Sequence, residues 1–201
     1  MSRDPARAAT QFFGGRVCLD FANTLDWRLS DSPVELIPDY PALLAWSERR
    51  QTLPARAVAR LRAQAARRTE AEVILREAHL LRGQIWAIAE DLIGRRRARL
   101  SALNRRLAEL PSEPGLCFQG GRYVFELDGA NLSQPLWPVL WSLTAVLASE
   151  DAARVGSYQA EGCGWYYIDE SPGHSRMWCS SEVCGNRERV RRAYARRRSK
   201  A

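Results

Sequence analysis

Three cysteines near the C-terminus constrain the fold of this chain more than any other feature. Cys163 begins the aromatic run CGWYYID, and Cys179 and Cys184 follow in the stretch WCSSEVC. The turn residues ESPGHS, 170–175, separate the aromatic run from RMWC. The sequence therefore predicts a β-hairpin with Cys163 and Cys179 at its open end. Cys184 follows one turn later, where a helix is expected to begin and to favour a thiolate. The spacing indicates part of a small structural metal site.

A structural zinc site needs about four nitrogen or sulfur ligands in a tetrahedron, and this stretch supplies three cysteines. A pair with the spacing of Cys179 and Cys184 would place the missing cysteine where Tyr158 stands. His174 is the nearest other ligand, but it lies near the expected hairpin tip, roughly 15 Å from the open end. Three alternatives follow: zinc held by the three cysteines with an unidentified ligand or water, zinc that also uses His174, and a hairpin held without zinc by its aromatic residues.

The positive charge of the chain is concentrated behind these cysteines. The formal net charge is +7, and eight basic residues follow Cys184 against one acidic residue, whereas residues 1–184 carry 22 of each sign. A basic helix of this kind predicts a polyanionic partner, because arginines on its outer face can reach DNA phosphates. The candidate nucleic-acid-binding residues are Arg187, Arg189, Arg191, Arg192, Arg196, Arg197, Arg198 and Lys200. Two other interpretations are a solvated basic tail and, for Arg187, a bracing contact to Asp169.

The N-terminal part of the chain offers a second candidate site. The run RVCLDFAN, 16–23, alternates between two faces and predicts a β-strand, and a loop is expected over 26–38. Asp20, Asn23 and Thr24 are candidate ligand-binding residues, because polar groups near a strand end can line a pocket. The alternative is structural: Asn23 and Thr24 cap the following turn, and Asp20 pairs with a nearby arginine.

Four helices are predicted after this loop. Asp39 and Thr52 are the expected caps of the first two, which end near Arg50 and Arg68. A Thr-x-x-Glu capping box at Thr69 opens the third helix. Its apolar residues recur at helical spacing and form one stripe: Ile74, Ala78, Leu81, Ile85, Ile88 and Leu92. A fourth helix follows it.

The remaining patterns complete an α+β chain. Two apolar runs around a Gly-Gly pair predict a β-hairpin over 116–128, and Ser133 is the expected cap of a further helix. Helices and strands segregated in this way favour an α+β fold. We expect an N-terminal mixed domain at 1–152, for ligand binding or dimer contacts, and a small finger made of a β-hairpin and a basic helix at 153–201.

The motifs CGWYYID, WCS and CGNR, together with Ser171 and Arg176, resemble the CGNR zinc-finger family. GGRVCLDFANTL resembles the start of the ABATE domain that precedes the finger in that family. The resemblance implies a treble-clef-like finger that binds zinc, in a bacterial transcription regulator linked to stress whose ABATE domain takes a small ligand. Three of the four family cysteines fall on Cys163, Cys179 and Cys184. The first falls on Tyr158, and this departure concerns zinc binding more than the shape of the finger.

Other classes of protein are disfavoured by missing motifs. No stretch approaches ~18 uncharged apolar residues, and the N-terminus lacks an apolar signal core. We therefore expect a cytoplasmic protein without a membrane span. No phosphate-binding glycine loop, H-E-x-x-H or nucleophile elbow occurs, so no catalytic residue is assigned and no enzyme is expected.

Together these patterns predict a DNA-binding transcription regulator with a ligand-sensing N-terminal domain. A protein- or RNA-interaction module with a metal-free finger is the alternative. A single finger gives limited specificity, which favours a homodimer on double-stranded DNA.

Overall fold

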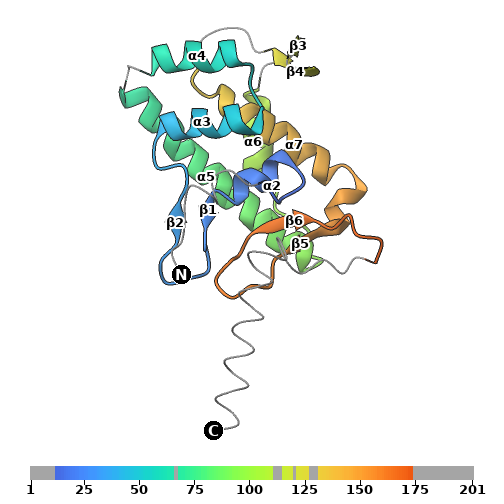
Figure 1. The fold of residues 1–201 in the computed structure, drawn as a ribbon. Helices are drawn as coiled ribbons and strands as arrows, with labels where there is room; N and C mark the ends of the chain where they lie inside the picture. The colour runs from blue at the N-terminus through green and yellow to red at the C-terminus, as the bar shows by residue number, and fades with distance from the viewer. Residues whose placement is uncertain (1–11, 66–67, 111–114, 120, 127–130, 174–201) are drawn as a thin grey trace.

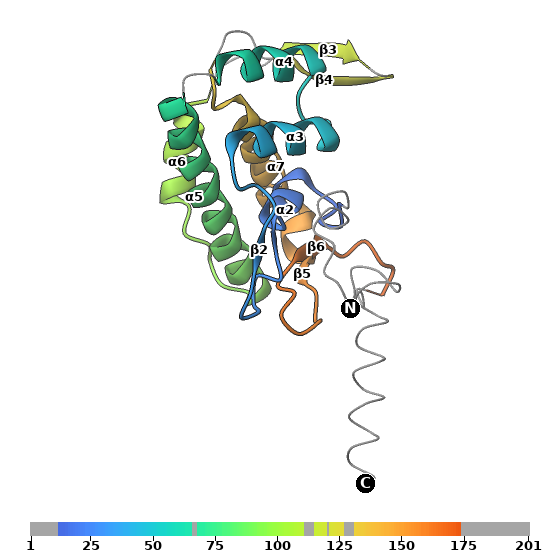
Figure 2. The ribbon, with the colours of Figure 1, turned by 60° about the vertical axis from the view of Figure 1, so that its left-hand side comes forward.

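A long helix, α5 (Arg68–Ile93), organises the molecule (Figures 1 and 2). The structure is a computed structural model that describes residues 12–65, 68–110, 115–119, 121–126 and 131–173. The predicted apolar stripe of α5 is confirmed: Ala78, Leu81 and Ile85 are fully buried, and the rest of the stripe packs against the same core. Helical periodicity identified this element correctly because only one face of α5 contacts the core.

Five other described helices pack around α5, and the shortest of them, α2 (Val17–Ala22), is central. The others are α3 (Tyr40–Arg50), α4 (Ala55–Gln64), α6 (Ser101–Ala108) and α7 (Trp137–Leu147), with 3₁₀ turns at Gln134–Leu136 and Glu150–Arg154. Helix α2 lies between α5 and α7 and contacts both (Figure 2). Helix α6 is joined to α5 by Arg106, which pairs with Glu77 at 2.6 Å.

The predicted strand at 16–23 is wrong, because this segment forms helix α2. Every residue from Cys18 to Ala22 is at most 4% exposed. A six-residue helix that is buried on all sides has no polar face, so alternation in its sequence carries no information about its period. Gly14 supports the helix, since a side chain there would meet the Asp20 nitrogen at 2.6 Å. Gly14 thus allows the chain to approach α2 closely.

The helix caps show where local signals held and where they failed. Asp39 caps α3 as predicted, and its side chain accepts a hydrogen bond from the Ala42 N–H at 2.7 Å. Thr52 does not cap α4, which begins at Ala55 and ends at Gln64, short of the predicted end. The Thr52 hydroxyl instead donates to the Ser47 carbonyl at 3.3 Å. Thr52 does not act as a cap because its hydroxyl bonds to the last turn of α3.

One further predicted cap is wrong, and another occupies the cap position without forming a cap hydrogen bond. Thr69 lies inside α5, which has already begun at Arg68, so the capping box does not start that helix. Ser133 makes no cap hydrogen bond to the backbone, and its hydroxyl accepts from the Trp137 indole at 3.0 Å. A 3₁₀ turn follows Ser133, and α7 begins only at Trp137.

The described strands form antiparallel hairpins, which are β1 (Leu25–Asp26) with β2 (Val34–Glu35), β3 (Gly115–Gln119) with β4 (Arg122–Glu126), and β5 (Val155–Ser157) with β6 (Tyr166–Ile168). The β3–β4 hairpin confirms the prediction around the Gly-Gly pair. The β1–β2 hairpin stands where only a loop was expected. Strand β6 pairs with β5, and the returning stretch that was expected to pair with it lies outside the described residues. The fold is α+β, as predicted.

The described start of the predicted finger is continuous with the larger core. Val155, Tyr166 and Ile168 of the β5–β6 hairpin pack in the same buried cluster as α2, α5 and α7. Phe13, Tyr158, Cys163, Trp165 and Tyr167 belong to a second, smaller cluster on the other side of this hairpin. No described helix is long and apolar enough to cross a membrane.

Candidate functional site

Asp20, the first predicted ligand-binding residue, is buried within α2, with its side chain 1% exposed. Its carboxylate accepts from the Gly14 N–H at 2.8 Å and from Arg50 Nε at 2.7 Å. Burial raises the pKa of Asp20, and Arg50 and the Gly14 N–H oppose that rise. The pairing with an arginine matches the structural interpretation of this residue.

Asn23 and Thr24 follow α2 and join separate elements of the core. Asn23 accepts from the Tyr166 N–H at 2.8 Å and donates to the Tyr166 carbonyl at 2.9 Å, so its amide pairs with the backbone of β6. Thr24 donates to the Phe21 carbonyl and accepts from Arg82 Nη1 at 3.0 Å. Both residues are at most 5% exposed. Ligand binding by Asp20, Asn23 and Thr24 stays a prediction, and their observed contacts are structural.

Arg82 shows how this polar interior is balanced. Its side chain is 5% exposed and forms a two-pronged ion pair with Glu35, which also accepts from the Ile37 N–H at 2.8 Å. Burial raises the pKa of Glu35, but the hydrogen bonds and the charge of Arg82 lower it by more. The pKa of Glu35 is therefore below its ordinary value. The ion pair therefore favours the ionised carboxylate in the folded protein.

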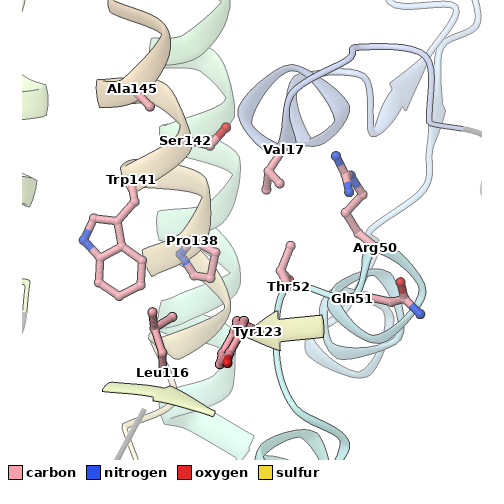
Figure 3. Close-up of a pocket in the computed structure, with 10 residues that line it drawn as sticks. All are labelled: Val17, Arg50, Gln51, Thr52, Leu116, Tyr123, Pro138, Trp141, Ser142 and Ala145. Atoms are coloured by element: carbon pink, nitrogen blue, oxygen red, sulfur yellow. The ribbon is translucent and has the colours of Figure 1, made fainter. Parts of the chain in front are cut away.

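An open groove of about 440 Å³ lies beside this interior, and we call it the α7 groove (Figure 3). Its walls come from α2, the end of α3, the β3–β4 hairpin and α7. The lining residues are Val17, Arg50, Gln51, Thr52, Leu116, Tyr123, Pro138, Trp141, Ser142 and Ala145. The wall is mainly apolar and aromatic, and Arg50 is the one charged residue among the described residues that line it. Such a wall with few polar groups is typical of small-molecule sites.

Arg50 connects the groove to the interior. Its Nε pairs with Asp20, and its guanidinium carbon lies 5.4 Å from the centre of the Phe12 ring. A guanidinium has about four N–H donors besides the one on Nε, so the Asp20 bond leaves capacity for an anion. No sequence pattern indicated this groove, because its residues are contributed by five separated segments of the chain.

The metal prediction rests on residues that the structure describes only in part. Cys163 is 4% exposed and belongs to the smaller buried cluster. Cys179, Cys184 and His174 lie outside the described residues, as do all eight candidate nucleic-acid-binding residues from Arg187 to Lys200. Within the described ranges, no group of three or more His, Cys, Asp or Glu residues could hold a metal ion.

The described donor set does not fit a four-cysteine zinc site. Tyr158 stands at the first ligand position, and its ring stacks on Tyr167 while its hydroxyl donates to the Phe13 carbonyl at 2.9 Å. Zinc in structural sites takes thiolate and imidazole ligands, and this position offers neither. Cys163 is the one described cysteine of the predicted set. The predicted partner of Arg187, Asp169, accepts from the Ser171 N–H and hydroxyl.

The two remaining cysteines differ in their surroundings. Cys18 is fully buried in α2, and burial raises the pKa of its thiol to about 12. It therefore behaves as a small apolar core residue. Cys117, in β3, is only partly buried.

Comparison with known families agrees with this architecture, in which a helical core leads into a terminal hairpin. Residues 15–150 match ABATE, described as "Putative stress-induced transcription regulator", and residues 154–197 match the CGNR zinc finger. The chain therefore belongs to the ABATE family, and a CGNR zinc-finger domain follows its ABATE domain. No match was found among curated proteins.

Proposed function

We propose that this protein is a DNA-binding transcription regulator that acts in the cytoplasm as a homodimer. One observation carries the proposal: the whole formal net charge of +7 lies after Cys184, within and just beyond the segment that matches the zinc finger. A concentrated basic segment on a regulator is suited to duplex DNA, because each arginine that meets a phosphate releases a counterion. Two copies would supply two fingers and raise specificity.

The ABATE domain is proposed to sense an amphipathic organic anion in the α7 groove. Val17, Pro138 and Trp141 offer an apolar wall for the body of such a ligand, and Arg50 offers a cation for its carboxylate or sulfonate. We assign no catalysis to the groove, because the lining residues that the structure describes include no carboxylate, histidine or cysteine, and the Ser142 hydroxyl accepts from the Cys18 N–H.

The decisive experiment measures fluorescence anisotropy of labelled duplex DNA at about 50 and 200 mM salt, where counterion release gives a steep dependence. The full chain is compared with a chain that ends at Glu188. We expect submicromolar binding at low salt by the full chain and loss of binding on truncation. Equal binding by both chains, or binding by neither, would refute a role of the basic segment in DNA recognition.

A charge-matched pair of variants separates location from net charge. Arg197→Gln with Arg198→Gln removes two charges from the basic segment, and Arg97→Gln with Arg99→Gln removes two exposed charges after α5. The first pair should lower the salt slope by about 2, and the second should leave it unchanged. Circular dichroism checks that each variant is folded.

The second candidate function is an RNA- or protein-interaction module. A departure from the zinc ligand set at Tyr158 favours it, since a finger without metal need not act on DNA. Binding of an RNA hairpin or an acidic peptide, tighter than that of duplex DNA in the same assay, would select this alternative.

A further inference from the structure

The β5–β6 hairpin presents different chemistry on its two faces. Strand register pairs Gly156 with Tyr167 and Ser157 with Tyr166. The face that carries Tyr166 packs into the large core with Val155 and Ile168. The opposite face carries Tyr158, Trp165 and Tyr167, which form the smaller cluster with Cys163 and are each at most 6% exposed. Side chains on both faces of the β5–β6 hairpin are therefore buried.

Tyr158 has the contacts of a structural core residue. Its ring lies 4.4 Å from the Tyr167 ring, centroid to centroid, with an angle of 22° between their planes. Gly156 makes room for this arrangement, because a side chain there would come within 2.8 Å of the Tyr167 ring. The Tyr158 hydroxyl donates to Phe13, and the Phe13 ring lies 6.2 Å from that of Trp165. The Trp165 indole N–H donates to the Leu25 carbonyl at 3.3 Å, so two polar groups of this stack bond within the chain.

The turn that carries Cys163 is held by the N-terminal domain on both sides. The Leu29 N–H donates to the Gly162 carbonyl at 3.1 Å, and Arg28 Nε donates to the Gly164 carbonyl at 3.2 Å. Gly162 and Gly164 have positive φ values of 78° and 68°, a conformation that favours glycine. In addition, the Cys163 N–H donates to the Ala160 carbonyl at 3.0 Å. These hydrogen bonds connect the turn to the Arg28–Leu29 segment and to its own backbone.

We propose that the β5–β6 hairpin of this zinc finger is held by an aromatic stack in place of a metal ion. The stack consists of Phe13, Tyr158, Trp165 and Tyr167, and Tyr158 takes the position that a first cysteine ligand would occupy. Structural zinc sites normally supply the folding free energy that their small hairpins lack. Here the stack and the contacts of Arg28 and Leu29 supply it, and the hairpin folds as part of the ABATE core. This inference goes beyond DNA binding and does not depend on it.

Hydrogen exchange of the full-length protein tests the proposal. Amide exchange of residues 155–168 is followed by mass spectrometry with and without EDTA, and the zinc content is measured by elemental analysis. We expect EDTA to change exchange in this segment by less than a factor of about two, whatever the zinc content. A large increase in exchange that zinc reverses would overturn the proposal.

Three variants separate the stack from metal ligation. Tyr158→Ala should lower Tm by about 5–10 °C and raise exchange at 155–168, because it opens a large cavity. Cys163→Ala should lower Tm by at most about 3 °C. Tyr158→Phe keeps the stack and should stay close to the wild type in exchange.

Two results from these variants would contradict the stack. One is a Cys163→Ala chain whose hairpin exchanges as fast as that of Tyr158→Ala. The other is a Tyr158→Phe chain that loses bound zinc and hairpin protection together, since the phenol oxygen would then be a ligand. If Tyr158→Ala does not fold, Tyr158→Phe and the EDTA comparison on the wild type still decide.

Discussion

The interior around α2 and the α7 groove are neighbouring regions with opposite chemistry. Asp20, Asn23 and Thr24 are polar and buried, and each bonds to a backbone or side-chain group of another element. The groove is open, and its wall is mainly apolar with one cation, Arg50. Asp20, Asn23 and Thr24 therefore bond to buried groups of the chain, whereas the described surface of the groove is largely apolar.

Arg50 is where the two regions meet. It neutralises the buried Asp20 from one side and lines the groove on the other. An anion of the kind proposed above would contact the same guanidinium that pairs with Asp20. The following changes test whether the two regions are as different as the structure indicates.

The largest effect is expected from breaking the buried ion pair of the interior. Glu35→Gln leaves Arg82 without its carboxylate partner and should reduce the free energy of unfolding by about 3 kcal/mol. Urea denaturation followed by circular dichroism measures it. The matched control is Glu48→Gln, whose partner Arg62 is half exposed, and it should cost about 1 kcal/mol or less. Equal losses in the two variants would show that burial does not determine how much an ion pair contributes to the free energy of unfolding.

A second change removes the amide that joins α2 to β6. Asn23→Ala deletes both hydrogen bonds to Tyr166 and leaves that residue's buried N–H and C=O without these partners. We expect the free energy of unfolding to fall by about 2 kcal/mol. Asn104→Ala on the exposed face of α6 is the control and should lie within about 0.5 kcal/mol of wild type. A loss no larger than that of the control would contradict the structural role of Asn23.

A change of pH should have a smaller effect on stability than Glu35→Gln, because it removes only part of the contribution of Glu35. The pKa of Glu35 is lowered from its ordinary value of 4.5 in the folded state. Its contribution to stability is therefore present above that value and is lost as the pH falls through the folded pKa. The difference in urea midpoint between wild type and Glu35→Gln should shrink from pH 7 towards pH 3. The pKa of Asp20 is raised, so its effect on stability has the opposite pH dependence: its contribution is lost as the pH rises. A difference that grows on acidification would reverse the assignment for Glu35.

The smallest effect on stability is expected in the groove. Ala145 is exposed and lines it, so Ala145→Trp should change the free energy of unfolding by no more than about 0.5 kcal/mol. The larger side chain should nevertheless block uptake of an apolar anionic probe, anilinonaphthalene sulfonate, followed by its fluorescence. Ala148→Trp, exposed just after α7 but outside the groove lining, should leave probe binding unchanged. Equal probe binding by wild type and both variants would place the probe elsewhere.

Elements with one apolar face were predictable, and elements buried on all sides were not. The stripe of α5 and the β3–β4 hairpin were correct, because periodicity and turn residues act locally. Helix α2 was predicted as a strand, since its polar Asp20 is satisfied by Gly14 and Arg50 and not by solvent. Thr52 was predicted as a cap, but its hydroxyl had a nearer partner in α3. Partners of this kind are set by the tertiary structure and do not follow helix or strand periodicity.

The sequence by itself determined the family, the α+β class, the long helix and the concentration of charge after Cys184, since each depends on composition or short-range spacing. It also located Tyr158 at a ligand position. Only the tertiary structure decided what Tyr158 does there, that the β5–β6 hairpin is continuous with the ABATE core, and which residues line the α7 groove. Those features depend on contacts between segments far apart in the chain. In addition, an element buried on both faces lacks the polar and apolar alternation that distinguishes a buried face from an exposed one.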